Sequence, residues 1–134
     1  MKILILEDDN NRIVKFRDKL SRHALLFVNS AADAIKLLLN EGETFDMIFL
    51  DHDLGGEVYV DSSNTNTGSE VVRWLISDQD RIMIQPYIII HSLNYPAAQE
   101  MQLNLTNYGY KYVYRIPYTK LVSDYLDDPH FLEV

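Results

Sequence analysis

Residues 46–56 read Asp-Met-Ile-Phe-Leu-Asp-His-Asp-Leu-Gly-Gly, an apolar run that ends in acidic, histidine and glycine residues. The run 46–50 is nearly all apolar, which is typical of a central strand in a parallel sheet whose two faces are covered by helices. Its carboxyl end carries side chains that can do chemistry, namely Asp51, His52 and Asp53. This stretch therefore predicts both the centre of the fold and the edge at which a site would lie.

Similar apolar runs lie on either side of this stretch and alternate with segments of helical periodicity. Strands are expected at 2–6, 24–28, 46–50, 87–90 and 110–116, and helices at about 11–20, 31–39, 68–76, 96–105 and 119–126. Five such β–α units predict an α/β fold in which helices cover both faces of a parallel sheet. The polar stretch 55–68 exceeds the usual connection length, so it is either a mobile lid over a substrate or ordinary surface.

Length and composition exclude several classes of protein. The chain has 134 residues, which suits a single domain over 1–134, and no cysteine, which excludes disulfide scaffolds and thiol catalysis. Its net charge of −8 argues against a broad nucleic-acid surface. No apolar run approaches the roughly 20 residues of a membrane span and no signal peptide is evident, so a cytoplasmic protein without a membrane partner is expected. The tail, about 127–134, is expected to be loosely attached.

Acidic side chains follow two of the predicted strands. Residues 7–9, Glu-Asp-Asp, follow the first strand, and Asp51 and Asp53 follow the third. Ligands of open parallel sheets bind beyond the carboxyl ends of the strands, where the strand order reverses. Closely packed carboxylates are costly unless a cation lies among them, and Mg²⁺ prefers such oxygen ligands. The cluster predicts a site for Mg²⁺ or Mn²⁺ that could receive a phosphate; the alternative is that residues 7–9 only cap the next helix.

Two parts of the chain resemble the receiver domains of two-component response regulators. They are residues 1–9, Met-Lys-Ile-Leu-Ile-Leu-Glu-Asp-Asp, and the apolar strand that ends at Asp51. The resemblance implies a flavodoxin-like three-layer sandwich whose five parallel strands have the order 2-1-3-4-5. It also implies that Glu7 and Asp8 help to hold Mg²⁺. Asp51 would ligate the same ion and accept a phosphoryl group, and Asp53 would contribute its backbone carbonyl.

Other positions depart from the receiver pattern. Receiver domains carry a lysine before a proline after the fifth strand, but here Ile116 precedes Pro117 and the nearest base is Arg115. The small hydroxyl residue expected after the fourth strand could be Ser92, but His91 competes for that place. These departures argue against ordinary phosphorelay switching.

Two histidine motifs narrow the resemblance. Residues 50–55, Leu-Asp-His-Asp-Leu-Gly, together with residues 91–94, His-Ser-Leu-Asn, are similar to the receiver-like family predicted to process cyclic phosphates. The resemblance implies a substrate that carries a 2′,3′-cyclic or related phosphate, either a small molecule or an RNA end.

The residue types support such chemistry independently. Histidine titrates near neutral pH, so His52 and His91, at the ends of adjacent strands, could serve as general base and general acid on one phosphate. Asp51 could instead attack the phosphorus and form an aspartyl phosphate. The alternative for each histidine is a structural hydrogen bond to Asp51 or Asp53. Phosphate-binding hydrogen bonds are expected from Ser92, Asn94, Arg115 and the backbone of Gly55 and Gly56.

Two functions follow from these residues. The first is a metal-dependent phosphoesterase that acts on a cyclic phosphate. The second is a non-catalytic, divergent receiver that uses Asp51 as a phosphoacceptor or serves as an interaction module.

Tyrosines gather near the fifth predicted strand. Tyr110, Tyr112 and Tyr114 alternate, so they would share one face of that strand. Packing of an edge strand against its helices explains most of this pattern. Aromatic surface is also enriched at interfaces, so a homodimer through this face is a second hypothesis.

Overall fold

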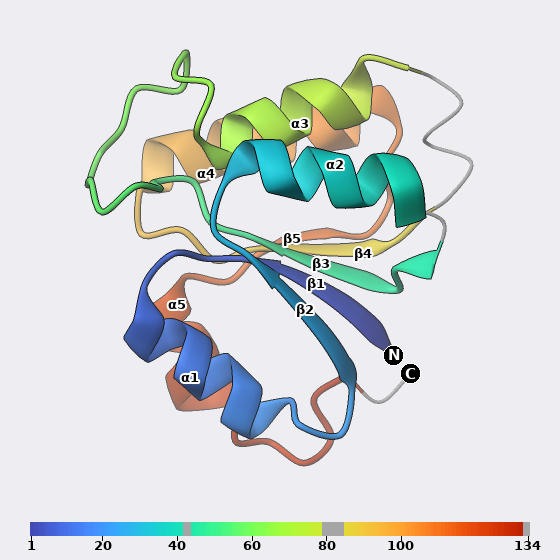
Figure 1. Cartoon of the computed structure of the whole chain (residues 1–134), viewed down its shortest axis with the longest axis vertical. Coiled ribbons are helices and arrows are strands. Elements are labelled where there is room, and N and C mark those ends of the chain that lie inside the picture. The colour runs from blue at the N-terminus through green and yellow to red at the C-terminus, as the bar shows by residue number, and fades with distance from the viewer. Residues whose placement is uncertain (42–43, 79–84, 133–134) are drawn as a thin grey trace.

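In the computed structural model, which describes residues 1–41, 44–78 and 85–132, the strands form one parallel sheet with the order β2-β1-β3-β4-β5 (Figure 1). Its strands are β1 (Lys2–Leu6), β2 (Ala24–Val28), β3 (Met47–Leu50), β4 (Tyr87–Ile90) and β5 (Val113–Arg115). The reversal of strand order falls between β1 and β3, which places their carboxyl ends side by side. The predicted flavodoxin-like fold and strand order are confirmed.

Helices cover both faces of this sheet (Figure 1). One face is covered by α2 (Ala31–Glu41), α3 (Gly68–Ile76) and α4 (Tyr95–Tyr108). The opposite face is covered by α1 (Asn10–Lys19) and by α5 (Tyr118–Lys120), which continues into a π-helical turn at Leu121–Tyr125. The result is a three-layer sandwich with a hydrophobic core on each side of the sheet.

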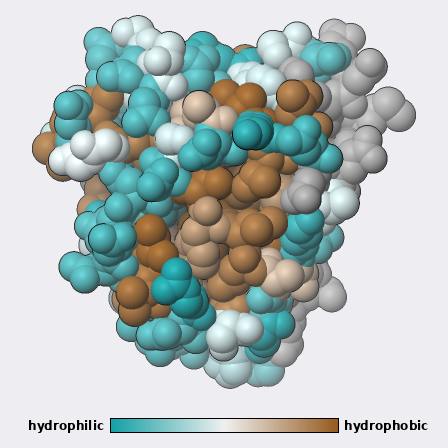
Figure 2. All heavy atoms as spheres, viewed as in Figure 1, coloured by the Kyte–Doolittle hydropathy of each residue, from teal (hydrophilic) through white to brown (hydrophobic). Residues whose placement is uncertain are grey.

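Alternation along the strands divides the apolar side chains between the two cores. In β1, Ile3 and Ile5 pack toward α1, whereas Leu4 and Leu6 pack toward the opposite helical layer, and all four are fully buried. The edge strand β2 is only half-buried, and Figure 2 shows the apolar band that it presents between the two helical layers. Central strands therefore read as continuous apolar runs because both of their faces are covered.

Local capping explains where two of the helices begin. The side chain of Asp9 accepts hydrogen bonds from the backbone of Asn11 and Arg12 and so caps α1. Asn94 caps α4 by accepting a hydrogen bond from the backbone of Ala97. The capping interpretation of the acidic run 7–9 therefore holds for its last residue.

The region of the fifth strand differs from expectation, because β5 is limited to Val113–Arg115. Tyr110 is buried, and its hydroxyl donates to the carbonyl of Leu75 at 3.0 Å, so it belongs to the core. Tyr112 and Tyr114 are exposed. The expectation that three tyrosines share one face of the strand was wrong for Tyr110, since the chain enters the strand only after that residue has packed beneath α3.

The last described residues contact α1 and the loop that follows it. Arg22 donates to the carbonyls of Pro129 and Phe131, and Lys19 forms an ion pair with Asp127. The ring of Phe131 lies 5.5 Å from that of Tyr125. Among the described residues no helix has the length and hydropathy needed to cross a membrane.

Candidate functional site

An acidic cavity lies at the carboxyl ends of β1, β3 and β4, where the sequence places its acidic and polar residues. Its volume is about 340 Å³. It is lined by Glu7, Asp8, Asp9, Arg12, Asp51, Asp53, Gly56, Glu57, Val58, Tyr59, Ser92, Leu93 and Asn94. The topology therefore brings together residues separated by more than 80 positions in the chain, as Glu7 and Asn94 illustrate.

Glu7 is the most deeply buried carboxylate of this cavity, with no exposed surface. One of its oxygens accepts hydrogen bonds from the backbone of Asp8 and Asp9, and the other accepts one from Nε2 of His91 at 3.1 Å. Burial by itself would raise the pKa of Glu7, but the hydrogen bond and charge of His91, the backbone of Asp9 and the charge of Arg12 lower it to about 2. Glu7 is therefore held in its ionised form.

Asp51 lies beside Glu7, but its pKa is shifted in the opposite direction. It is 5% exposed and accepts a hydrogen bond from the backbone of His52 at 2.8 Å. Burial raises the pKa of Asp51 to about 7; the charge of Glu7 adds to this rise and the charge of His91 opposes it. Asp51 is thus a carboxyl whose ionisation is opposed by burial and by the charge of Glu7.

The side chains fit a divalent cation of the Mg²⁺ or Mn²⁺ type. Glu7 and Asp51 offer carboxylate oxygens that lie within 4.8 Å of each other and of a ring nitrogen of His91. Asp8 lines the same cavity, with one oxygen accepting a hydrogen bond from the backbone of Gly56 at 2.8 Å. Carboxylate oxygens are the ligands that Mg²⁺ prefers, and a dication would remove the cost of ionising Asp51.

Arg12, at the start of α1, is a site residue that the sequence reasoning missed. Its guanidinium lies 3.6 Å from Glu7 and 3.9 Å from Asp51, and it lies over the ring of Tyr118 at 4.5 Å. It stands three residues after Asp9, the helix cap, so the first turn of α1 points it back toward the strand ends. That short spacing from the acidic run was the available signal.

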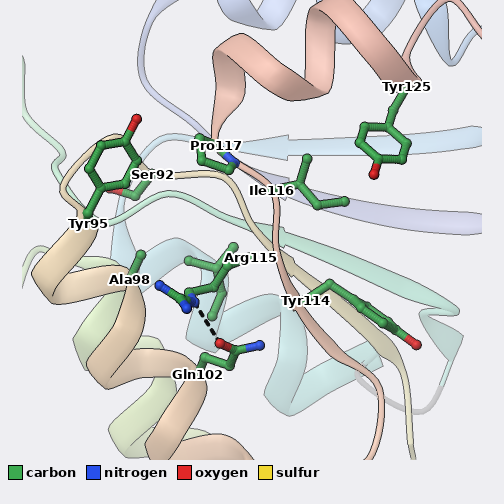
Figure 3. Close-up of a pocket in the computed structure, with 10 residues that line it drawn as sticks. Ser92, Tyr95, Ala98, Gln102, Tyr114, Arg115, Ile116, Pro117 and Tyr125 are labelled. Atoms are coloured by element: carbon green, nitrogen blue, oxygen red, sulfur yellow. Dashed lines mark hydrogen bonds between the residues drawn. The ribbon is translucent and has the colours of Figure 1, made fainter.

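Arg115 lies elsewhere, contrary to the expectation that it binds the same phosphate. Its Nε donates to Oε1 of Gln102 on α4 at 2.6 Å, and it lines a separate cavity (Figure 3). The reason is the direction of its side chain, which packs along α4 rather than toward the acidic edge of the sheet. The guanidinium of the acidic cavity belongs to Arg12.

The two histidines do not converge on the cavity. Both are fully buried and neither lines it. His91 packs edge-on against Phe16 and Phe49, in the core beneath α1. Because Leu50 pairs with Ile90 in register, His91 stands at the level of Asp51 and on its side of the sheet.

His52 is one residue further along and contacts a different set of groups. Its Nδ1 lies 2.7 Å from Asp53, and its Nε2 lies 3.3 Å from the hydroxyl of Ser62. The expectation that both imidazoles face one substrate is therefore not met, because strand alternation separates them. Each instead has the structural hydrogen bond to a carboxylate that was the stated alternative, although the carboxylate beside His91 is Glu7.

The expected phosphate-binding groups are divided between the cavity and its surroundings. Ser92 and Asn94 both line it, and the side-chain amide of Asn94 donates to Asp53 at 3.1 Å. Gly56 also lines it, but its N–H donates to Asp8. Gly55 is not among the lining residues. The backbone of Gly56 is thus used to orient Asp8.

Asp53 is held by more hydrogen bonds than its neighbours. Besides His52 and Asn94, the backbone groups of Tyr59 and Val60 donate to its carboxylate at 2.6 and 3.1 Å. Burial would raise the pKa of Asp53, but these four hydrogen bonds lower it below its usual value. Asp53 therefore ties the long loop, expected at 55–68 and observed between Asp53 and Gly68, to the end of β3.

Residues 2–107 match the family model described as the cyclic-phosphate processing receiver domain. The chain belongs to this family. The match covers more than half of the chain and includes Glu7, Asp51, His52 and His91.

Solved structures similar to this receiver domain support the fold. The Mn²⁺-bound form of response regulator Rcp1 is 19% identical, covering 85% of this chain and 78% of that one, with a TM-score of 0.56. The phosphorylated cyanobacterial phytochrome response regulator RcpA is 22% identical over the same shares, with a TM-score of 0.57. The N-terminal domain of an uncharacterized protein from Wolinella succinogenes is 18% identical, covering 87% and 80%, with a TM-score of 0.58. No curated protein gives a significant match to the sequence of this receiver domain.

Proposed function

We propose that the acidic cavity binds Mg²⁺ or Mn²⁺ together with a phosphate group, and that this receiver domain hydrolyses a 2′,3′-cyclic phosphate on a nucleotide or an RNA end. The observation that carries the proposal is the buried pair of Glu7 and Asp51 in a cavity that also contains a guanidinium. The family match supports the substrate class. The Mn²⁺ bound to the similar structure of Rcp1 supports the choice of ion.

The cation would be held by Glu7, Asp8 and Asp51, with the backbone carbonyl of Asp53 as a further ligand. Such an ion neutralises phosphate oxygens and orients water. Its fit rests on Asp51, whose ionised form is costly in the cavity unless positive charge is added. The net reaction adds one water: an oxygen of water bonds to phosphorus, one bond from phosphorus to a ribose oxygen breaks, and that oxygen takes up a proton.

Arg12 would contact the phosphate. Its guanidinium already faces the space between Glu7 and Asp51, and the ring of Tyr118 supports it from behind. Guanidinium groups match phosphate oxygens with paired hydrogen bonds. Arg12 would thus take the place of the lysine that receiver domains carry after the fifth strand. Ser92 and Asn94, which also line the cavity, would add hydrogen bonds.

The histidines would act as positioning residues. His91 holds Glu7, and His52 holds Asp53, so each would orient a carboxylate without touching the substrate. This assignment replaces the direct acid and base roles expected from the sequence. Its support is the complete burial of both rings.

A second candidate function is favoured by one observation. Neither histidine lines the cavity, so no imidazole is placed there for acid–base catalysis, whereas Asp51 lines it and would accept a phosphoryl group as in a non-catalytic receiver. The phosphorus of the phosphoryl group would bond to a carboxylate oxygen of Asp51, and its bond to the oxygen of the donor's leaving group would break.

Labelling separates these candidates. The full chain is incubated with Mg²⁺ and acetyl phosphate, and the mass of intact protein is measured. The hydrolase proposal expects no stable phosphoryl adduct in the wild type and Mg²⁺-dependent binding of inorganic phosphate that Asp51→Asn weakens at least tenfold. Asp18→Asn, which removes an exposed carboxyl of α1, is the matched control and should bind as the wild type does. A stoichiometric adduct lost only in Asp51→Asn would favour the phosphoacceptor.

A further inference from the structure

We propose that a second cavity, next to the acidic one, receives the base and ribose of the nucleotide whose phosphate occupies the acidic cavity. This inference rests on the proposed function, because it assigns the rest of the substrate to a place in the fold. The cavity lies between α4 and the segment from Tyr114 to Pro117 (Figure 3). Its volume is about 540 Å³, within the range of roughly 300–1,000 Å³ that is usual for small-molecule sites.

The two cavities share a wall. Ser92, which follows β4 and is only 2% exposed, lines both of them. Its hydroxyl accepts a hydrogen bond from the backbone of Asn94, so the turn between β4 and α4 is held in place. The two cavities therefore adjoin at Ser92, and a ligand that occupies both would pass this residue.

The walls of the second cavity offer the chemistry that a nucleoside requires. Tyr95 and Tyr114 line it and are about half exposed, so their ring faces are available for stacking on a base. Ala98 and Ile116 add apolar side chains to the lining. Figure 3 shows Tyr95 and Tyr125 at opposite ends of the cavity, with Ile116 between them.

A polar pair is set into this otherwise apolar and aromatic surface. Arg115 and Gln102 point toward each other and share a hydrogen bond of 2.6 Å (Figure 3). A guanidinium and an amide, both planar, can bind the edge of a base or the hydroxyl groups of ribose. Arg115 also adds positive charge near an anionic ligand in a chain whose net charge is −8.

A base-free ligand gives the sharpest test. Affinities for adenosine 2′,3′-cyclic phosphate, ribose 2′,3′-cyclic phosphate and inorganic phosphate are measured by calorimetry with the full chain and Mg²⁺. The inference expects the ligand with the base to bind at least ten times more tightly than the ligand without it. Equal affinities for the two cyclic phosphates would overturn the inference and leave the proposed function intact.

Variants locate the effect. Tyr114→Ala and Arg115→Gln should each weaken binding of the nucleotide about tenfold while leaving the affinity for inorganic phosphate within twofold, which also shows that they fold. Tyr112→Ala is the matched control, because Tyr112 is an exposed tyrosine near β5 that does not line the cavity. Unchanged nucleotide affinity in both cavity variants would overturn the assignment.

Two further measurements distinguish this inference from a failure of the phosphate site and from a dimer interface on the same face. Adenosine alone, titrated into isotope-labelled protein, should shift the backbone resonances of Tyr95, Tyr114 and Arg115; shifts confined to other residues would contradict the inference whatever the fate of the phosphate site. If Tyr114→Ala instead converts a dimer to a monomer in sedimentation and leaves nucleotide binding unchanged, this face is an interface between two copies of the chain, and the inference is wrong.

Discussion

Nε2 of His91 lies 3.1 Å from Oε1 of Glu7, and both side chains are completely buried. This contact joins the end of β4 to the end of β1 across the intervening strand β3. It helps to keep the carboxylate of Glu7 ionised inside the protein, beside Asp51, whose pKa is raised to about 7. The buried carboxyl pair of the acidic cavity is therefore asymmetric before any ligand binds, since Glu7 is ionised at neutral pH and a cation would favour the ionised form of Asp51.

Loss of His91 should destabilise the protein. His91→Gln removes the partner of a fully buried carboxylate, which typically costs about 2 to 4 kcal/mol of unfolding free energy. Urea unfolding at pH 7 measures the effect. His130→Gln, at an exposed position, is the control and should change stability by less than about 0.5 kcal/mol. Equal stability of the two variants would show that the contact does not stabilise the fold.

Glu7 should make the protein acid-sensitive. Its folded pKa, about 2, lies below the ordinary value of 4.5, so its contribution to stability is fully present above pH 4.5 and is lost as the pH falls toward 2. Unfolding free energies measured from pH 6 to pH 2 should decline more steeply for the wild type than for Glu7→Gln. Parallel curves would contradict this role for Glu7.

Asp51 should act in the opposite direction in metal-free protein. Its folded pKa, about 7, lies above the ordinary value of 3.8, so its ionisation opposes folding increasingly as the pH rises from about 4 to 7. Asp51→Asn should therefore be more stable than the wild type at pH 8 in EDTA, by about 1 to 3 kcal/mol. Mg²⁺ should raise the melting temperature of the wild type and leave that of Asp51→Asn nearly unchanged. A variant less stable than the wild type in EDTA would contradict the argument.

Arg12 should have opposite effects on the two ligands. Because its guanidinium supplies positive charge beside Glu7 and Asp51, Arg12→Gln should bind Mg²⁺ several times more tightly. The same variant should bind inorganic phosphate at least tenfold more weakly in saturating Mg²⁺. Arg17→Gln, an exposed arginine of the same helix, should change neither affinity. Weaker binding of both ligands would mean that Arg12 only maintains the fold of the cavity.

Gly68 should be intolerant of any side chain. A Cβ at this position would overlap the carbonyl oxygen of Asp51 and lie 2.8 Å from the methyl group of Met101. Gly68→Ala should therefore destabilise the protein by about 3 kcal/mol or more. Gly56→Ala meets no neighbouring atom but has a φ of +77°, so a smaller loss of about 1 to 2 kcal/mol is expected. Thermal unfolding of both variants measures these losses. A Gly68→Ala variant that is more stable than Gly56→Ala would refute the expected order.

The fold could be predicted from the sequence because its central strands are continuous apolar runs, as in Ile48–Leu50, bounded by polar residues. The acidic site could be predicted for a related reason, since parallel strands bring Glu7 and Asp51 to the same edge of the sheet. These inferences need only hydrophobicity and topology. The predicted positions of β2 and β4 agree with the structure residue for residue.

The remaining features depend on direction, which composition does not reveal. His52 and His91 looked equivalent in sequence, but the register that pairs Leu50 with Ile90 puts their side chains in different surroundings. The rotation of α1 about its axis brings Arg12 over the strand ends, and no sequence motif predicts this position. Residues 67–70, Thr-Gly-Ser-Glu, have the spacing of a capping box, but the hydroxyl of Thr67 donates instead to the carbonyl of Asn64 in the preceding loop.

Turnover of a cyclic phosphate distinguishes a hydrolase from a receiver domain that only binds its ligand. The full chain is mixed with adenosine 2′,3′-cyclic phosphate and Mg²⁺ or Mn²⁺, and the phosphorus resonances are followed by NMR. With the wild type, we expect the resonance of the cyclic ester to be replaced by the resonance of a phosphomonoester. With Asp51→Asn, or with the wild type in EDTA, we expect the resonance of the cyclic ester to remain. A cyclic ester that persists unchanged with both metals, in protein shown to bind phosphate, would contradict the proposed hydrolysis.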